Sequence, residues 1–201
     1  MIETIREVLA RPWAYRLFFR TIGAHGRSRV LVRDHIRPRK HDRVLEIGCG
    51  PGTIVPFLPD VEYVGFDSNE AYIIEARRRF PRGRFVCERV SEYTLPERGY
   101  FDIALALGIL HHLDDAEARR LFQIAHEALK PGGRLVTLDG VWTSDQSGAT
   151  RYLLARDRGR FVRSEKAYLD LAGPLFANVK STIHHGMLRI PYTHIILECT
   201  R

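Results

Sequence analysis

The chain has 201 residues, 45% of them hydrophobic and 27% charged, which suits one soluble domain with a core of its own. No run approaches the length of a membrane-spanning helix, and the charged N-terminal segment lacks the apolar core of a signal peptide, so we expect a cytoplasmic protein that contacts no membrane. The formal net charge of +7 permits a nucleic-acid partner, but the basic residues are dispersed, which favours a solvated basic surface or an anionic small substrate.

The first elements predicted along the chain are two helices, over "PWAYRLFFRTIG" (12–23) and "SRVLVRDHI" (28–36). Both precede the first strand pattern, so they lie outside the core sheet. We therefore expect residues 1–39 to form an N-terminal helical cap and residues 40–201 to form the main domain, within one compact unit.

Short apolar runs rich in β-branched residues then alternate with sequences of helical periodicity. This alternation predicts a parallel sheet covered by helices on both faces. After residue 140 the pattern changes to two helices, over 147–162 and 164–176, and two strands that can pair only as an antiparallel hairpin, since three residues separate them. The strands predicted before residue 141 are 43–48, 62–67, 83–88, 100–107 and 133–140, and the helices are 51–58, 69–80 and 115–129.

A glycine-rich loop, in "VLEIGCGPG" (44–52), directly follows the first predicted strand. Parallel sheets bind ligands at the carboxyl ends of their strands, where the loop turns into the next helix. Glycine permits positive φ and lets another molecule approach the backbone. Gly48, Gly50 and Gly52 therefore indicate a site for a nucleotide-like ligand.

The loop does not match the dinucleotide fingerprint, because Thr53 stands where the third glycine of G-x-G-x-x-G falls. Glu46 precedes the loop, and its carboxylate would repel a pyrophosphate but suit an ammonium or sulfonium ligand. Asp67, at the tip of the second strand, can accept hydrogen bonds from both hydroxyls of a ribose. The alternative for Asp67 is that it caps the helix that starts near Asn69.

Four motifs carry a resemblance: "VLEIGCGPG", "YVGFD", "YFDIALALGILHHL" and "LKPGGRLV". In this order they resemble the motifs of class I S-adenosylmethionine-dependent methyltransferases, over about residues 40–140. The terminal hairpin is also typical of that family. The resemblance implies an α/β fold with a Rossmann-like, seven-stranded, mostly parallel sheet, an antiparallel last strand and helices on both faces. It also implies methyl transfer from S-adenosyl-L-methionine, with S-adenosyl-L-homocysteine as product.

The resemblance implies a set of cofactor-binding residues, in which Asp67 holds the ribose and Ser68 lies beside the adenine. One position departs from the family, because Glu88-Arg89 stands where Gly-Asp is common, and arginine cannot accept a hydrogen bond from adenine. Either Glu88 replaces the aspartate, or Arg89 stacks on the ring, or the Val90 amide serves alone. The implied set is Glu46, Gly48, Cys49, Gly50, Gly52, Asp67, Ser68, Glu88, Arg89, Val90, Leu107 and Gly108.

Two histidines, His111 and His112, follow the fourth strand and are the candidate catalytic residues. A hydroxyl or ammonium acceptor must lose a proton, and histidine is the usual base near neutral pH. The alternative is that one of them only hydrogen-bonds the backbone. We expect no metal, because Asp114 and Asp115 come too late after the strand and resemble helix caps.

The acceptor is expected to contact residues outside the cofactor motifs, and Arg151, Arg158 and the segment 189–194 suit an anionic acceptor. The function predicted is transfer of a methyl group to an oxygen or nitrogen of a small molecule. Alternatives are methylation of RNA, a scaffold that only binds the cofactor, and nicotinamide-dependent reduction, which the glycine spacing disfavours. RNA is disfavoured because "LGIL" stands where base-methylating enzymes carry (N/D)PP(Y/F). The candidate acceptor residues are Tyr15, Phe19, Asp139, Trp142, Arg151 and His184.

Overall fold

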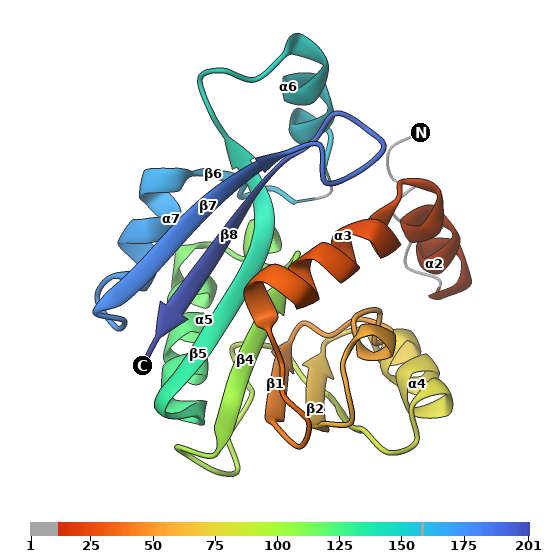
Figure 1. Cartoon of the computed structure of the whole chain (residues 1–201), viewed down its shortest axis with the longest axis vertical. Coiled ribbons are helices and arrows are strands. Elements are labelled where there is room, and N and C mark those ends of the chain that lie inside the picture. Colours follow the sequence, from red (N-terminus) through yellow and green to blue (C-terminus); the bar gives the residue numbers. More distant parts are fainter. Residues whose placement is uncertain (1–11, 158) are drawn as a thin grey trace.

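A single twisted sheet organises the molecule, and the computed structural model describes residues 12–157 and 159–201 (Figure 1). Its strands coincide with the predicted apolar runs to within a few residues at each end. They are β1 (Arg43–Ile47), β2 (Glu62–Asp67), β3 (Arg84–Cys87), β4 (Phe101–Leu107), β5 (Leu129–Trp142), β7 (Asn178–His185) and β8 (Thr193–Thr200), with the short β6 (Arg163–Ser164) beside the end of β5.

The strand order β3-β2-β1-β4-β5-β8-β7 confirms the predicted fold. Strands β1 to β5 run parallel, whereas β8 pairs antiparallel with β5 and with β7. The chain goes outward from β1 in one direction through β2 and β3, and in the other through β4 and β5. Open parallel sheets bind ligands at this reversal, outside the carboxyl ends of the strands.

Helices cover both faces of the sheet, as predicted. Helices α3 (Ala24–Leu31) and α4 (Glu70–Arg79) lie against one face of the sheet, and α5 (Asp115–Ala128) and α7 (Glu165–Ala172) lie against the other (Figure 1). Asn69 caps α4 by accepting the Tyr72 amide, and Asp114 caps α5 by accepting the Glu117 amide. The helices are α2 (Pro12–Thr21), α3 (Ala24–Leu31) with a π-helical continuation η1 (Val32–Ile36), α4 (Glu70–Arg79), α5 (Asp115–Ala128), α6 (Gly148–Ala155) and α7 (Glu165–Ala172).

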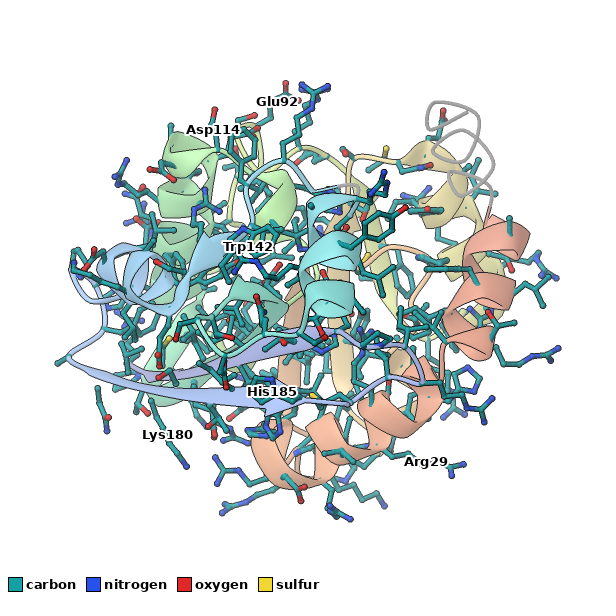
Figure 2. The ribbon with its side chains drawn as sticks, turned by 90° about the horizontal axis from the view of Figure 1, so that it is seen from above. Arg29, Glu92, Asp114, Trp142, Lys180 and His185 are labelled. Atoms are coloured by element: carbon teal, nitrogen blue, oxygen red, sulfur yellow. The ribbon has the colours of Figure 1, made fainter. Side chains whose placement is uncertain are left out.

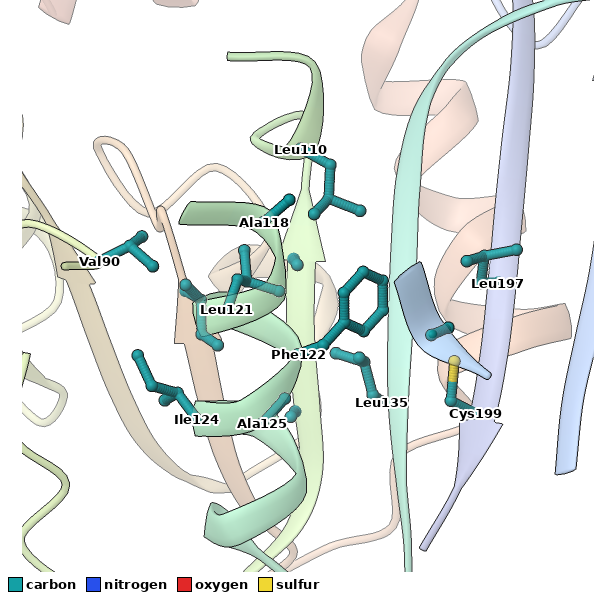
Figure 3. Packing of buried hydrophobic residues seen from close by; sticks show 14 of the residues in the cluster. Val90, Leu110, Ala118, Leu121, Phe122, Ile124, Ala125, Leu135, Leu197 and Cys199 are labelled. Carbon is teal, nitrogen blue, oxygen red and sulfur yellow. The ribbon is translucent and has the colours of Figure 1, made fainter. Parts of the chain in front are cut away.

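Helix α5 buries the apolar stripe that its sequence predicts. Leu121, Phe122 and Ala125 are fully buried against β4 and β5 in the larger of two core clusters (Figure 3). The second cluster lies on the opposite face, where Leu31 of α3 and Ile36 of η1 are fully buried with sheet residues. The N-terminal helices therefore contribute to the core, while the boundary at residue 39 stays a prediction.

One predicted helix is wrong. Residues 51–58 form turns and a single 3₁₀ turn, η2 (Val55–Phe57). Gly52 has a φ of +71°, which is incompatible with a right-handed helix, and Pro56 cannot donate the amide hydrogen bond that a helix interior needs. The helix predicted over 147–162 is also shorter than expected, since α6 ends at Ala155.

The surface of the described residues is largely polar. Charged side chains such as Arg29 and Lys180 project away from the sheet (Figure 2). The three cysteines are free, with Cys49 and Cys199 buried and Cys87 exposed. Among the described residues, no helix has both the length and the apolar character needed to cross a membrane.

Candidate active site

A cleft of about 400 Å³ opens at the carboxyl ends of β1, β2 and β4, where the strand order reverses. Sequence motifs predicted most of its lining. Four apolar or aromatic lining residues were missed, Phe66, Tyr72, Ile109 and Leu113; all but Tyr72 lie within the quoted motifs. The predicted residues that line the cleft are Gly48, Gly50, Asp67, Ser68, Glu88, Arg89, Val90, Leu107, Gly108 and His112.

The three glycines of the loop serve different purposes. All have positive φ, but a Cβ on Gly48 would lie 2.3 Å from Ile109, and one on Gly52 would lie 2.9 Å from Phe80. A Cβ on Gly50 would meet only Tyr72, at 3.9 Å. Gly48 and Gly52 are therefore required by packing inside the protein, and Gly50 leaves open space on the side where a ligand would lie.

Asp67 connects the loop to the next helix. Its Oδ2 accepts the Gly50 amide at 2.9 Å and its Oδ1 accepts the Asn69 amide at 2.8 Å. Burial raises the pKa of Asp67, and the two amide bonds offset part of that rise. Each oxygen keeps a further lone pair for a hydroxyl donor. The helix cap itself is Asn69, so the alternative capping role of Asp67 is not what the structure shows.

The structure does not bring Glu46 to the cleft. Its side chain is 3% exposed and accepts a hydrogen bond from the Tyr63 hydroxyl beneath the loop. Burial raises its pKa to about 8, against the lowering effect of the Tyr63 bond. Cys49 packs behind the loop against Gly65, and Gly52 also lies outside the cleft lining. Glu46 therefore presents no carboxylate to a cationic ligand in this structure.

The residues after β3 do line the cleft. Glu88 is half-buried, Arg89 is exposed and Val90 is buried. The Glu88 amide donates to the Asp67 carbonyl at 3.1 Å, which places the segment beside the ribose candidate. All three interpretations of this segment therefore stay open.

The two candidate histidines are separated by the fold. His112 is exposed and lines the cleft, whereas His111 is 8% exposed and turns toward the end of β5. The His111 Nδ1 lies 2.7 Å from the Asp139 Oδ1, and its backbone amide donates to the same oxygen at 3.2 Å. The two imidazole rings lie 4.2 Å apart between centroids.

The predicted acceptor residues do not converge on the cleft. Trp142 packs with Arg151, whose guanidinium lies 5.7 Å from the ring centroid, and neither lines the cleft. His184 is wrong as a cleft residue, because its Nε2 lies 3.2 Å from the Nε2 of His35 on η1. Phe19 is buried beneath the Arg27 guanidinium and lines a separate cavity. Asp139 is buried against His111 and does not line the cleft. The Tyr15 side chain lies outside the described residues.

The donor set of the cleft fits an adenosine-containing cation better than a metal. Asp67 offers two carboxylate oxygens at the strand tip, and Gly50 leaves space beside them. Within the described residues, no group of three or more His, Cys, Asp or Glu side chains is arranged to hold a metal ion.

Comparison with known proteins agrees with this geometry. Residues 44–133 match the family described as "Methyltransferase domain". Trans-aconitate 2-methyltransferase of Methylobacterium radiotolerans is 31% identical over 71% of this chain and 62% of its own length. A 37.1 kDa protein in transposon TN4556 of Streptomyces fradiae is 35% identical over 57% of this chain. The chain spans only 34% of that relative, so whole-protein activities do not transfer directly.

Solved structures share the fold at low sequence identity. Phosphoethanolamine N-methyltransferase 2 of Haemonchus contortus, in complex with S-adenosyl-L-methionine, superposes with a TM-score of 0.70 at 16% identity over 88% of this chain and 52% of that one. A TehB-like methyltransferase from Corynebacterium glutamicum gives a TM-score of 0.66 at 18% identity and covers 94% of this chain and 98% of its own. The matched segment contains β1, the glycine loop, Asp67 and β4. Residues 44–133 therefore match a methyltransferase domain, and the chain shares its fold with solved S-adenosylmethionine-dependent methyltransferases.

Proposed function

We propose that the protein transfers a methyl group from S-adenosyl-L-methionine to an oxygen or nitrogen of a small molecule that can carry negative charge. The observation that carries this proposal is Asp67, whose two oxygens are fixed by amides at the open end of the glycine loop. The cofactor supplies an electrophilic methyl group on a sulfonium. The protein's task is to bind, align and exclude water.

The residues of the cleft divide this task. Asp67 would accept the ribose hydroxyls, and Ser68 and Val90 would lie beside the adenine. Leu107 and Gly108, at the tip of β4, would face the methionine portion. Alignment of nucleophile and methyl group is worth roughly 7–11 kcal/mol of the barrier in well-oriented intramolecular reactions, so positioning alone can supply most of the rate.

Basic side chains near the N-terminal helices support an anionic acceptor. A cavity of about 370 Å³ is lined by Arg20, His25 and Arg79, and an adjoining one of about 400 Å³ shares Arg20 and His25 and adds Arg189. No Asp or Glu side chain of the described residues lines either cavity. The trans-aconitate methyltransferase relative, named for a polycarboxylate substrate, supports the same class of acceptor.

Methylation of RNA is the second candidate, and the net charge of +7 favours it. A tRNA U34 carboxymethyltransferase from Pseudoalteromonas atlantica is 27% identical over 66% of this chain. Against RNA, the cleft residues that follow Gly108 are Ile109, His112, Leu113 and Glu117, and this described set contains no Phe, Tyr or Trp side chain on which a base could stack.

Transfer of radioactive methyl label from the cofactor tests the proposal. The purified protein is incubated with a small-molecule pool and, separately, with total RNA. We expect label in small molecules, and at least about a tenfold loss in Asp67→Ala but not in the exposed control Asp170→Ala. Label in RNA instead would establish the second candidate. A protein that binds the cofactor but labels neither pool would be a scaffold.

A further inference from the structure

One wall of the cleft is held from behind by a segment that lines no part of the cleft. The wall follows β4 and consists of Ile109, the 3₁₀ turn η3 (Leu110–His112) and Leu113. The segment behind it, residues 159–163, comes about 50 residues later in the chain, and we call it the clamp segment. None of these five described residues is part of the cleft lining. The clamp segment therefore acts on the cleft only through the wall.

Backbone carbonyls of the wall bond to the clamp segment at three places. The Phe161 amide donates to the His111 carbonyl at 3.0 Å. The Arg163 guanidinium donates to the carbonyls of Leu110 and Leu113, each at 2.8 Å. A single 3₁₀ turn satisfies few of its own carbonyls, and a buried carbonyl without a partner is costly. The clamp segment thus supplies the hydrogen bonds that fix the path of the wall.

Arg163 also bonds the helix that follows the wall. Its Nε and Nη2 donate to the Asp115 Oδ1 at 3.1 and 2.8 Å, and Asp115 is the first residue of α5. The same first turn carries Glu117, which lines the cleft. Arg163 is only 8% exposed, and its planar guanidinium contacts all of these oxygens at once. A lysine at this position has one ammonium and could not reproduce the set.

Close packing reinforces the hydrogen bonds. A Cβ on Gly159 would lie 2.5 Å from the His111 carbonyl oxygen and would overlap the His111 ring, although the φ of Gly159 lies outside the left-handed region. Glycine is therefore required there by the close approach of the two segments and not by its own backbone conformation. On the other side of the wall, the Ile109 side chain occupies the space in which a Cβ of Gly48 would lie. The wall is thus enclosed between the clamp segment and the glycine loop.

We propose that Arg163 is a positioning residue of the cofactor site, and that the clamp segment sets the affinity for S-adenosyl-L-methionine without contacting it. This inference rests on the proposed function. Arg163 holds the backbone of residues 110–113, which places His112 and Leu113 in the cleft and Ile109 against the glycine loop. Release of the wall would let that packing shift, and the loop geometry that binds the cofactor would shift with it. By linkage, a bound cofactor stabilises the clamped arrangement in return.

The first test measures calorimetric affinity for S-adenosyl-L-methionine at a temperature at which circular dichroism shows each variant to be folded. We expect Arg163→Gln to weaken binding about tenfold or more, and Arg163→Lys to weaken it about threefold or more. Asp115→Asn removes the ion pair but keeps the carbonyl bonds, so its affinity should stay within about twofold of the wild type. Arg160→Gln, an exposed arginine of the same segment, should bind like the wild type.

Two further variants separate positioning from general stability. Gly159→Ala removes no hydrogen-bonding group but displaces the clamp segment, so it should also weaken binding about threefold or more, and it carries the test if Arg163→Gln does not fold. Leu197→Ala creates a cavity in the core at β8, away from the cleft lining. It should lower the urea denaturation midpoint while its affinity for S-adenosyl-L-methionine stays within about twofold of the wild type.

Amide hydrogen exchange of the wild type gives a readout that a purely structural role would not move. The Phe161 amide bonds the wall but does not line the cleft, so saturating S-adenosyl-L-methionine should slow its exchange at least about threefold. Unchanged exchange would overturn the inference. So would wild-type affinity in the folded Arg163 and Gly159 variants, or an equal loss of affinity in Leu197→Ala. A folded wild type that does not bind S-adenosyl-L-methionine would instead overturn the proposed function itself.

Discussion

Replacing Gly48 by alanine should destabilise the protein for two separable reasons. Its φ of +72° disfavours any Cβ, and the added atom would lie 2.3 Å from the Cδ1 of Ile109. Left-handed backbone costs an alanine about 1–2 kcal/mol, and overpacking costs about 1–3 kcal/mol, so we expect the free energy of unfolding to fall by about 2–5 kcal/mol.

Gly132 provides a matched control, because its φ is +77° but a Cβ there meets nothing within 4 Å. Gly132→Ala should therefore show only the backbone cost of about 1–2 kcal/mol. Urea denaturation followed by circular dichroism measures both variants. Adding Ile109→Ala to Gly48→Ala should recover part of the difference. Equal destabilisation by Gly48→Ala and Gly132→Ala would refute the packing role assigned to Gly48.

Three further predictions follow from the same contacts. Burial raises the pKa of Glu46 to about 8, so the folded state keeps a proton that the unfolded chain releases above the ordinary glutamate pKa. The free energy of unfolding should therefore fall by up to about 1.4 kcal/mol per pH unit as the pH rises from roughly 4.5 to 8. Urea titrations at several pH values should show that Glu46→Gln flattens that slope. Phe122→Ala should lower the free energy of unfolding by about 3–5 kcal/mol, since the side chain is fully buried between α5 and the sheet, and an unchanged denaturation midpoint would contradict that packing. Arg20→Gln combined with Arg189→Gln should weaken calorimetric binding of trans-aconitate about tenfold or more, whereas Arg29→Gln on the exposed face of α3 should not; equal affinities would remove the basic cavities from the acceptor site.

The fold and much of the cofactor cleft were predictable because both depend on short-range patterns. Period-two and period-3.6 hydrophobicity located the strands and helices, and Asp67 is placed by the strand that ends at it. Glu46 shows the limit of transferring a motif without its geometry. Strand alternation puts it on the same face as Val44, beneath the loop, and that signal was present in the sequence.

The acceptor side was not predictable from local pattern. His111 and His112 are adjacent in sequence, yet one faces Asp139 and Asp157 and the other faces the cleft. What separates them is a segment almost 50 residues later, whose Gly159 approaches His111 so closely that any other residue would collide with the ring. Contacts of that range depend on the whole fold. The failure of the predicted helix at residues 51–58 has a similar cause, because Gly52, with its positive φ, packs against the distant Phe80.

Calorimetric titration of the wild type and of an Asp67→Ala variant, each with S-adenosyl-L-methionine and with NADH, tests the central claim most directly. The account predicts micromolar binding of S-adenosyl-L-methionine, no binding of NADH, and at least about a tenfold loss of affinity in the variant. Folded wild-type protein that does not bind S-adenosyl-L-methionine, or that binds it equally well without the Asp67 carboxylate, would contradict the assignment of the cleft.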